Sequence, residues 1–202
     1  PLLAIALAMP PTRTATNTTQ SQPLRIVSWN TNGSTHYIKR KKILSYLQSK
    51  RADIALLQET HLDDLESSKL KRDGVGRILH SSHAASPDAS VGPCRKSGVA
   101  ILFCKSLPIT ITKTWVDEDG RYAFAKIKIG NHHLCIGSIY APIGSKRSFL
   151  LQINRILSEI GSSRCIKRGD WNLARDAVLD RTGPIDVCIN VDRAILDDVL
   201  TD

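Results

Sequence analysis

Apolar residues along much of the chain recur with the two-residue period of β-strands. In residues 121–129, for example, Ala123, Ala125 and Ile127 fall on one face and Lys126 falls on the other. Residues 53–57 form an almost continuous apolar run, as expected of a strand that is covered on both faces. These patterns predict strands at residues 24–29, 53–57, 99–103, 109–115, 121–129, 133–139 and 165–167.

Helical periodicity is clearest at residues 145–160, where apolar side chains recur at i, i+3, i+4 and i+7 and Gly161 ends the pattern. Residues 63–97 are polar and contain Gly, Ser and Pro, so we predict a loop there with at most a short edge strand. Strands outnumber helices, and helical segments connect the hairpins. This order predicts an α/β sandwich with the helices outside.

A second helix is predicted to start at a cap formed by Ser34 or Thr35 and to end near Lys50. Its basic residues at 39–42 are expected mainly in solvent. We expect its buried side to consist of Ile43, Leu44 and Leu47.

The start of the chain differs in composition from the rest. Residues 1–9 are apolar, but they are far fewer than the roughly 20 that a membrane span requires, and they lack the basic region of a secretory signal. Residues 10–23 are rich in Pro, Thr, Asn and Gln. We therefore expect a disordered lead over residues 1–23 and one folded domain over residues 24–202.

The net charge of the chain favours a polyanionic partner. The chain has 28 Lys and Arg against 19 Asp and Glu, a net charge of +9. Residues 176–202 have a net charge of −5, which leaves +14 on residues 1–175. A basic body attracts nucleic acid first and an anionic membrane second, although a soluble basic surface alone would also fit. The five well-separated cysteines include no C-x-x-C pair and favour neither zinc nor disulfides, so a reducing compartment fits best.

Candidate chemistry lies where predicted strands end. Asn30, Glu59 and Tyr140 each end a strand, and Asp170 is followed closely by Asn172 after another. Strand ends of one sheet can bring such groups together at one edge, which is where α/β folds place their sites. Each of these residues could also be structural, since Asn and Asp end strands for turn reasons alone and Tyr140 could be a half-buried strand aromatic.

The residue types fit phosphodiester hydrolysis. The Glu59 carboxylate suits Mg²⁺, which uses one or two carboxylates together with water and phosphate. Asp170 would orient or deprotonate the attacking water, Asn30 and Asn172 would hold phosphate oxygens or that water, and Tyr140 would donate to the phosphate. No Ser, His and Asp arrangement at a recognisable spacing supports a nucleophilic triad.

Six ordered motifs resemble the endonuclease/exonuclease/phosphatase superfamily. Together they resemble the endonuclease domain of LINE-type non-LTR retrotransposons, which is similar to exonuclease III and apurinic/apyrimidinic endonucleases. The resemblance covers about residues 24–190. The motifs are IVSWN at 26–30, LLQETH at 56–61, SGVAIL at 97–102, GRY at 120–122, IYAP at 139–142 and GDWN at 169–172.

This resemblance implies a four-layered α/β sandwich of two mostly antiparallel sheets flanked by helices. It implies nicking of DNA with Mg²⁺, Mn²⁺ being a possible substitute. Glu59 would lie on the metal ion, Asn30, Asp170 and Asn172 around metal, water and phosphate, and Tyr140 on the phosphate.

The sequence departs from the family pattern in two places. Lys167-Arg168-Gly169 stands where apolar residues and Gly-Gly are usual, and it could crowd or recharge the approach to the site. A further Asp and a closing Ser-Asp-His of the family have no counterpart before Asp202, so we expect a domain that is incomplete at its C-terminus.

The prediction is therefore a DNA endonuclease domain of retrotransposon origin, monomeric, without a membrane partner, and with a downstream reverse transcriptase as a possible companion. It would be intracellular and act in the nucleus. The alternatives are a cellular repair nuclease of the same superfamily and a catalytically dead DNA-binding fragment. Phosphatase members acting on inositol lipids fit the basic body less well.

Overall fold

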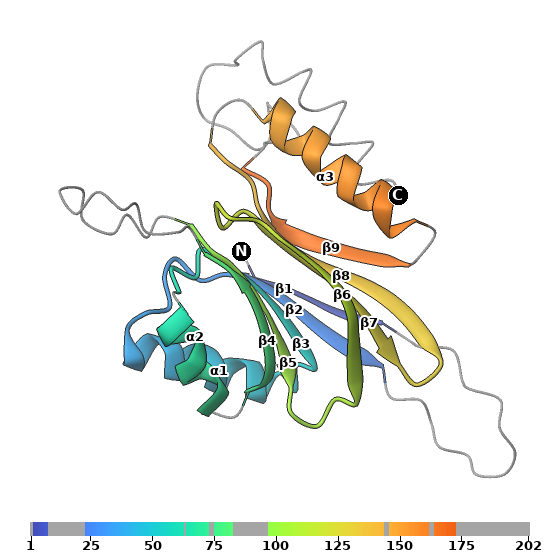
Figure 1. Ribbon diagram of the computed structural model, residues 1–202. Helices are drawn as coiled ribbons and strands as arrows, with labels where there is room; N and C mark the ends of the chain where they lie inside the picture. The colour runs from blue at the N-terminus through green and yellow to red at the C-terminus, as the bar shows by residue number, and fades with distance from the viewer. Residues whose placement is uncertain are drawn as a thin grey trace, which may run out of the picture.

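Two β-sheets stacked face to face form the centre of the protein in its computed structural model (Figure 1). The structure describes residues 2–7, 23–62, 64–72, 75–82, 97–143, 146–161 and 164–172. The first sheet has five strands in the order β1-β2-β3-β5-β4. They are β1 (Leu2–Leu7), β2 (Leu24–Asn30), β3 (Ile54–Gln58), β4 (Val75–Ser81) and β5 (Val99–Cys104).

The second sheet has four strands in the order β6-β7-β8-β9. They are β6 (Ile109–Val116), β7 (Tyr122–Ile129), β8 (His132–Tyr140) and β9 (Cys165–Asp170). Both sheets are mixed: β2 pairs with β3 and β8 pairs with β9 in parallel, while the remaining pairs are antiparallel. The seven predicted strands are confirmed, with small differences at their ends.

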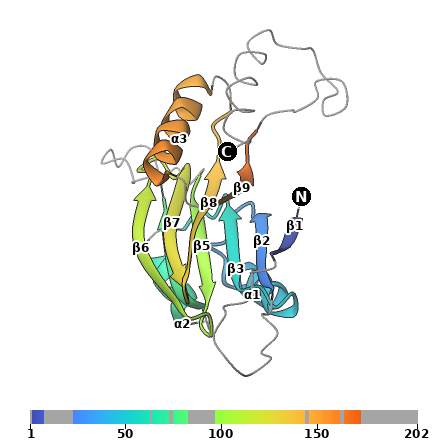
Figure 2. The same ribbon diagram turned by 90° about the vertical axis from the view of Figure 1, so that its right-hand side faces the viewer.

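Helices cover the outer faces of the two sheets, which gives four layers (Figures 1 and 2). The helices α1 (Tyr37–Ser49) and α2 (Asp64–Arg72) lie on the five-stranded sheet, and α3 (Arg147–Ile160) lies on the four-stranded sheet. Three apolar clusters fill the spaces between the layers. This arrangement confirms the predicted α/β sandwich. Among the described residues, no helix is long and apolar enough to cross a bilayer.

The strand alternation explains the cluster between the sheets. Ala123, Ala125 and Ile127 of β7 all point into it, and each is fully buried. Phe124 lies on the opposite face of β7 and packs in the cluster under α3. The period-two pattern thus divides one strand between two apolar layers.

The region between β3 and β5 differs from the prediction of a loop with at most a short edge strand, because it contains α2 as well as β4. The helix α2 buries Leu70 but leaves Leu65 68% exposed, so its apolar stripe is too narrow to identify from sequence. The strand β4 is indeed at the edge of its sheet, but it is seven residues long.

The predicted start of α1 is also wrong. His36 rather than Ser34 or Thr35 precedes the helix, and it makes no side-chain capping bond. The Ser34 hydroxyl is engaged elsewhere, because it donates to the Thr60 carbonyl at 2.8 Å. Ile43, Leu44 and Leu47 are buried as expected.

One basic residue of α1 is not in solvent as predicted. Arg40 is only 4% exposed, and its guanidinium donates to Glu66 of α2 at 2.6 Å. This ion pair joins the two helices. Arg40 was expected in solvent because α2, which carries its partner Glu66, was not predicted.

The expected disordered lead includes an ordered part. Leu2–Leu7 forms β1, which pairs antiparallel with β2 at the edge of the sheet (Figure 2). The apolar LLAIAL sequence satisfies the backbone of β2 on its open side. Residues 1 and 8–22 lie outside the described residues, and the boundary at residue 24 stays a prediction.

The helix α3 provides a test of the packing. Replacing Leu150, which is 0% exposed, by Ala should lower the free energy of unfolding by about 2–5 kcal/mol, because the substitution leaves a cavity against the four-stranded sheet. Leu151 is the matched control, since it is 52% exposed and its change to Ala should alter that free energy by less than about 0.5 kcal/mol. Urea unfolding followed by circular dichroism measures both, and equal losses would contradict the described packing.

Candidate active site

The two parallel strand pairs bring the predicted site residues to one edge of the sandwich. Asn30 is paired with Gln58 at the ends of β2 and β3, so Glu59 follows directly beside Asn30. Tyr140 is paired with Asp170 at the ends of β8 and β9. Both pairs end on the same side of the molecule, because side chains from the two sheets make hydrogen bonds there.

The amide of Asn30 joins the two sheets at this edge. Its Nδ2 donates to Glu59 Oε1 at 2.9 Å and to Asp170 Oδ2 at 2.9 Å. Its Oδ1 accepts from the backbone N–H of Asn32 at 3.0 Å, which fixes the orientation of the amide. Two carboxylates, 111 positions apart in sequence, therefore converge on one neutral side chain.

Asn172 is held against the same carboxylate. Its backbone N–H donates to Asp170 Oδ1 at 3.0 Å, and its side-chain amide donates to the Ala141 carbonyl at 2.7 Å. The Ala141 N–H in turn donates to the Asp170 carbonyl at 2.8 Å. Asn172 has a positive φ of 49°, which Asn tolerates better than most residues.

Tyr140 reaches the site from β8. It is 7% exposed, and its hydroxyl is hydrogen-bonded to Glu59. Burial, followed by the hydrogen bond and charge of Glu59, raises the pKa of Tyr140, so the phenol keeps its proton at neutral pH and remains a donor. The Arg121 guanidinium lies 5.3 Å from the ring centroid of Tyr140 and places a positive charge beside the phenol.

The turn that carries Glu59 is built by backbone contacts. Glu59 and His61 both have positive φ values, 49° and 54°. The N–H groups of Thr60 and His61 donate to the carbonyls of Gly98 and Ser97 at 3.0 and 3.1 Å. Gly98 has a φ of +115°, and a Cβ there would lie 2.7 Å from Thr60 Oγ1, so only glycine fits.

The loop after Asn30 is tied to this turn. The N–H groups of Gly33 and Ser34 donate to the carbonyls of Glu59 and Thr60 at 2.6 and 2.8 Å. The Thr31 hydroxyl donates to the Gln58 carbonyl at 3.0 Å. The two strand ends therefore hold each other in place, and the positions of Asn30 and Glu59 are coupled.

A buried polar group below the site was not identified from sequence. The Gln58 amide donates to Ser138 Oγ of the other sheet at 3.0 Å, and Ser138 Oγ donates to the Leu57 carbonyl at 3.0 Å. The same amide lies 3.4 Å from Ser28 Oγ. A signal existed, because each of these polar residues occupies a core-facing position of an otherwise apolar strand.

Two further residues beside the site were also not assigned. His61 lies near both Glu59 and Lys39. Burial lowers the pKa of His61, the charge of Lys39 lowers it further, and the charge of Glu59 raises it by less than burial lowers it. Its imidazole is therefore neutral at pH 7. Arg121 belongs to the GRY motif, and its guanidinium lies near the Tyr140 ring. Its backbone carbonyl also accepts a hydrogen bond from the Tyr140 N–H at 2.7 Å.

Lys167 of the unusual Lys167-Arg168-Gly169 segment lies on the face of β9 turned away from the site, so it does not block the approach to the site. Lys167 shares its face of β9 with Cys165, which packs in the cluster under α3 and not between the sheets. Arg168 is exposed on the same face as Asp170, so it adds positive charge near the site. A Cβ on Gly169 would overlap the Ile139 carbonyl, which explains why this glycine is present.

The donor set fits a hard divalent cation. Glu59 and Asp170 are both partly exposed, and the Asn30 amide presents its nitrogen to both of them. Within the described residues, no group of three or more His, Cys, Asp or Glu side chains converges. Carboxylate and water oxygens suit a hard divalent cation better than zinc, which prefers nitrogen and sulfur ligands.

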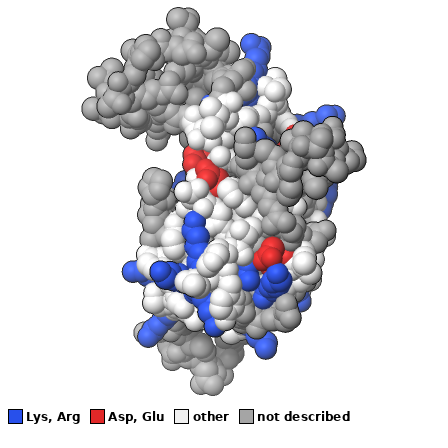
Figure 3. Space-filling view, turned by 90° about the vertical axis from the view of Figure 1, so that its left-hand side faces the viewer, with Lys and Arg blue, Asp and Glu red and all other residues white. Residues whose placement is uncertain are grey.

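Basic side chains gather on one part of the surface. On the face shown in Figure 3, most of the Lys and Arg lie over the lower half, with one small acidic group among them and a second above them. In α1, Lys39, Lys41 and Lys42 are exposed. The surface next to the carboxylates is thus attractive to a polyanion.

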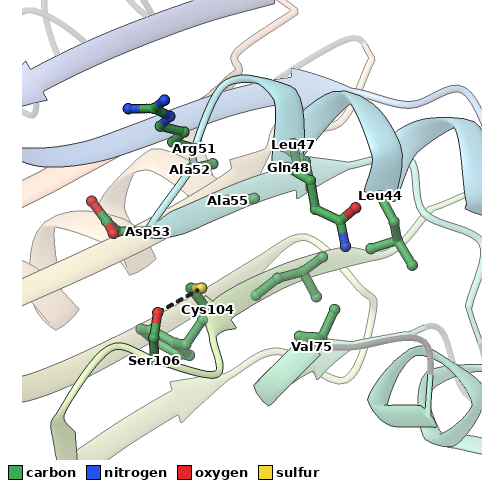
Figure 4. Close-up of a pocket in the computed structure, with 12 residues that line it drawn as sticks. Leu44, Leu47, Gln48, Arg51, Ala52, Asp53, Ala55, Val75, Cys104 and Ser106 are labelled. Atoms are coloured by element: carbon green, nitrogen blue, oxygen red, sulfur yellow. Dashed lines mark hydrogen bonds between the residues drawn. The ribbon is translucent and has the colours of Figure 1, made fainter.

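A cavity among the described residues lies away from the site. Its volume is about 300 Å³, and it opens between α1 and the strands β3 and β5 (Figure 4). Asp53, at its rim, precedes β3, whereas Glu59 follows that strand. The cavity is therefore at the opposite end of β3 from the carboxylates and takes no part in the site.

Sequence comparison agrees with the resemblance in the motifs. The profile of the Endonuclease/Exonuclease/phosphatase family matches residues 27–185. A probable RNA-directed DNA polymerase from transposon X-element of Drosophila melanogaster is 28% identical over 153 residues. That match covers 74% of this chain but only 15% of the relative, so the chain spans a small part of its length.

Structural comparison finds the same fold in several proteins. The endonuclease domain of TRAS1, a telomere-specific non-LTR retrotransposon, has a TM-score of 0.60 and 18% identity over 88% of this chain and 71% of its own. The human Nocturnin catalytic domain has a TM-score of 0.54 and 19% identity over 74% and 64%. Humanized D. rerio TDP2 has a TM-score of 0.54 and 21% identity over 81% and 68%.

The contact between Tyr140 and Glu59 predicts that the pKa of Tyr140 depends on the negative charge of Glu59. A Glu59→Gln change should lower the pKa of Tyr140 toward its ordinary value near 10, because it removes the neighbouring negative charge while burial remains. The near-ultraviolet absorbance of tyrosinate measures this, with Tyr140→Phe subtracted to isolate one phenol. An unchanged Tyr140 titration in Glu59→Gln would show that the two side chains do not interact.

Proposed function

The chain belongs to the endonuclease/exonuclease/phosphatase family, and we propose that it is a Mg²⁺-dependent endonuclease that nicks DNA for a non-LTR retrotransposon. The observation that carries this proposal is the convergence of Glu59 and Asp170 on the Asn30 amide. Two carboxylates this close repel each other, and a bound cation would remove that repulsion. Phosphodiester hydrolysis needs positive charge at the same place.

The site residues have distinct roles in this proposal. Glu59 and Asp170 would hold the ion, and the Asn30 and Asn172 side chains beside them would position the carboxylates and bind water or phosphate oxygens. When bound, the ion would supply positive charge to the scissile phosphate. Tyr140, protonated at neutral pH, donates a hydrogen bond to a phosphate oxygen, and Asp170 accepts a proton from the attacking water.

Arg121 supports the role of Tyr140. Its guanidinium lies against the ring and adds a fixed positive charge beside the phosphate position. The neutral His61 imidazole lies next to Glu59. Because it carries no positive charge, it does not compete with the ion for the negative charge of the carboxylates.

DNA is the favoured phosphodiester because of the surface charge. Lys39, Lys41 and Lys42 on α1 are exposed, and the Lys39 ammonium donates to the Asn32 carbonyl in the loop after Asn30. Several exposed lysines on one helix suit an extended polyanionic backbone better than a small phosphorylated molecule. The contacts offered are to phosphates, so we expect weak sequence preference from these residues.

The retrotransposon origin is supported by the relatives. The curated relative is named as a transposon RNA-directed DNA polymerase, and one structural relative is the endonuclease domain of a non-LTR retrotransposon. We propose that this domain works beside a reverse transcriptase, as a monomer, on chromosomal DNA in the nucleus. The alternative of a cellular repair nuclease is tested by including a duplex with an abasic site among the substrates.

Nicking activity tests the proposed site. With Mg²⁺, the chain extended through the family's further Asp and Ser-Asp-His should convert supercoiled plasmid to the open-circular form, whereas residues 1–202 alone should do so very poorly. In the extended chain, Glu59→Gln should slow nicking by about 10²- to 10³-fold because charge at the phosphate is no longer stabilised. Asp170→Asn should have an effect of similar size. Gel densitometry at equal folded concentration measures the rates.

Glu159→Gln provides the matched control, because it makes the same chemical change at a carboxylate on α3 that binds Trp115. It should leave the nicking rate unchanged. Addition of Mg²⁺ should also raise the melting temperature of the parent chain but not that of Glu59→Gln. An extended chain that neither nicks DNA nor responds to Mg²⁺ would overturn the proposal, and strong preference for the abasic duplex would favour a repair enzyme.

Salt dependence tests the proposed DNA surface. The logarithm of the affinity for duplex DNA should fall linearly with the logarithm of the salt concentration, with a slope of about −0.9 for each phosphate neutralised. The Lys39→Gln/Lys42→Gln double variant should flatten the slope by about 1.8. Lys128→Gln, exposed at the far end of β7, should leave it unchanged, and equal slopes in all three proteins would place the DNA elsewhere.

A further inference from the structure

A pair of thiols lies on the face of β8 and β9 that is turned away from the site. Cys135 and Cys165 are register partners on these parallel strands, so their side chains project in the same direction. Both belong to the apolar cluster beneath α3 (Figure 1). The backbone N–H of Cys135 donates to the Arg164 carbonyl at 2.8 Å, which fixes the pairing.

The two thiols are neighbours on paired strands and differ in exposure. Each thiol shifts the pKa of the other, as expected of side chains that lie close together. Cys135 is fully buried, whereas Cys165 is half-buried on the edge strand of the sheet. A small reagent from solvent therefore meets Cys165 first, with Cys135 immediately behind it.

A buried lysine lies beside this pair. Lys167 is two residues after Cys165 on the same face of β9 and is only 7% exposed. In the described part of the chain, its Nζ has no hydrogen-bond partner. A buried ammonium without a partner is costly, and a nearby thiolate would offset that cost.

The charges around Cys165 favour its thiolate. The hydrogen bond from Cys135 and the charge of Lys167 lower the pKa of Cys165, although burial opposes them. The hydrogen bond to Cys165 and burial raise the pKa of Cys135, and Lys126 of β7 opposes this. The helix α3 presents only apolar side chains to the cluster: Phe149, Leu150, Ile153, Ile156, Leu157 and Ile160.

We propose that Cys135 and Cys165 form a peroxide-sensitive dithiol site in which Lys167 activates Cys165 and Cys135 completes a reversible disulfide. The Cys165 thiolate attacks one oxygen of hydrogen peroxide, and the O–O bond breaks to give a sulfenic acid and hydroxide, which becomes water on taking the thiol proton. Cys135 then attacks this sulfur, an S–S bond forms, and a second water leaves with the Cys135 proton. Two thiols are oxidised and one peroxide is reduced to two waters.

The strand pairing permits this bond. Neighbouring strands lie about 4.8 Å apart, within the range of about 4.4–6.8 Å found between Cα atoms of disulfides. Cys135 lies five residues before Tyr140 on β8, and Cys165 lies five residues before Asp170 on β9. Tyr140 and Asp170 are also register partners, so the thiol pair and the site pair belong to the same ladder. Oxidation should therefore slow nicking, a consequence that rests on the proposed function, whereas formation of the disulfide does not.

Peptide mapping of the full chain tests the site. The protein is treated with substoichiometric hydrogen peroxide, free thiols are blocked with N-ethylmaleimide, and tryptic peptides are analysed by mass spectrometry. The Cys135–Cys165 disulfide should appear first and disappear with dithiothreitol. Cys104, which is more exposed but has no thiol partner among the described residues, is the internal control and should stay reduced. In Cys135→Ser, dimedone should trap a sulfenic acid on Cys165.

Variants of the lysine test its role separately. Lys167→Met should slow peroxide consumption by Cys165 at pH 7, by up to tenfold for each unit that the Cys165 pKa rises. Lys167→Arg keeps the charge and should stay within about twofold of the parent, and Lys128→Met controls for loss of a distant lysine. Earlier oxidation of Cys104, a disulfide that involves Cys94 or Cys188 instead, or an unchanged rate in Lys167→Met would overturn the proposal.

Discussion

The contact of the Asn30 amide with two carboxylates is the interaction on which the site depends. Glu59 comes from the five-stranded sheet and Asp170 from the four-stranded sheet, so the amide joins the sheets at the edge where the chemistry is proposed. A carboxylate at position 30 would add a third negative charge, and an apolar residue would remove one hydrogen-bond donor from each carboxylate. A neutral donor is the side chain that holds two like charges together and still leaves their charge available to a cation.

Backbone packing around that contact leaves little freedom. A side chain on Gly98 would meet Thr60, and one on Gly169 would overlap the Ile139 carbonyl. The glycines thus allow the chain to pass close to the turn that carries Glu59 and to the strand that carries Tyr140. Because close-packed interiors transmit small displacements, each glycine sets the position of a polar group that it does not touch.

Periodicity was enough to predict most of the sandwich, because Ala123, Ala125 and Ile127 repeat the strand period and α3 repeats the helix period. It failed where burial is partial: α2 buries Leu70 but exposes Leu65. The convergence of the strand ends was expected, but as the ends of one sheet, whereas Asn30 and Glu59 come from one sheet and Tyr140 and Asp170 from the other. The shared Asn30 amide was not expected, since one side chain bonding to both sheets depends on their stacking and not on local sequence.

The strands β8 and β9 carry one proposed site on each face, and their pairing joins the two. The face between the sheets ends in Tyr140 and Asp170, and the face under α3 carries Cys135, Cys165 and the buried Lys167. Both pairs of residues belong to one uninterrupted parallel ladder. The proposed disulfide would change the packing at one end of this ladder, and at the other end Gly169 lies against the Ile139 carbonyl with no space between them. Because close-packed strands transmit small shifts, such a change would reach Asp170, the carboxylate that the Asn30 amide holds in place.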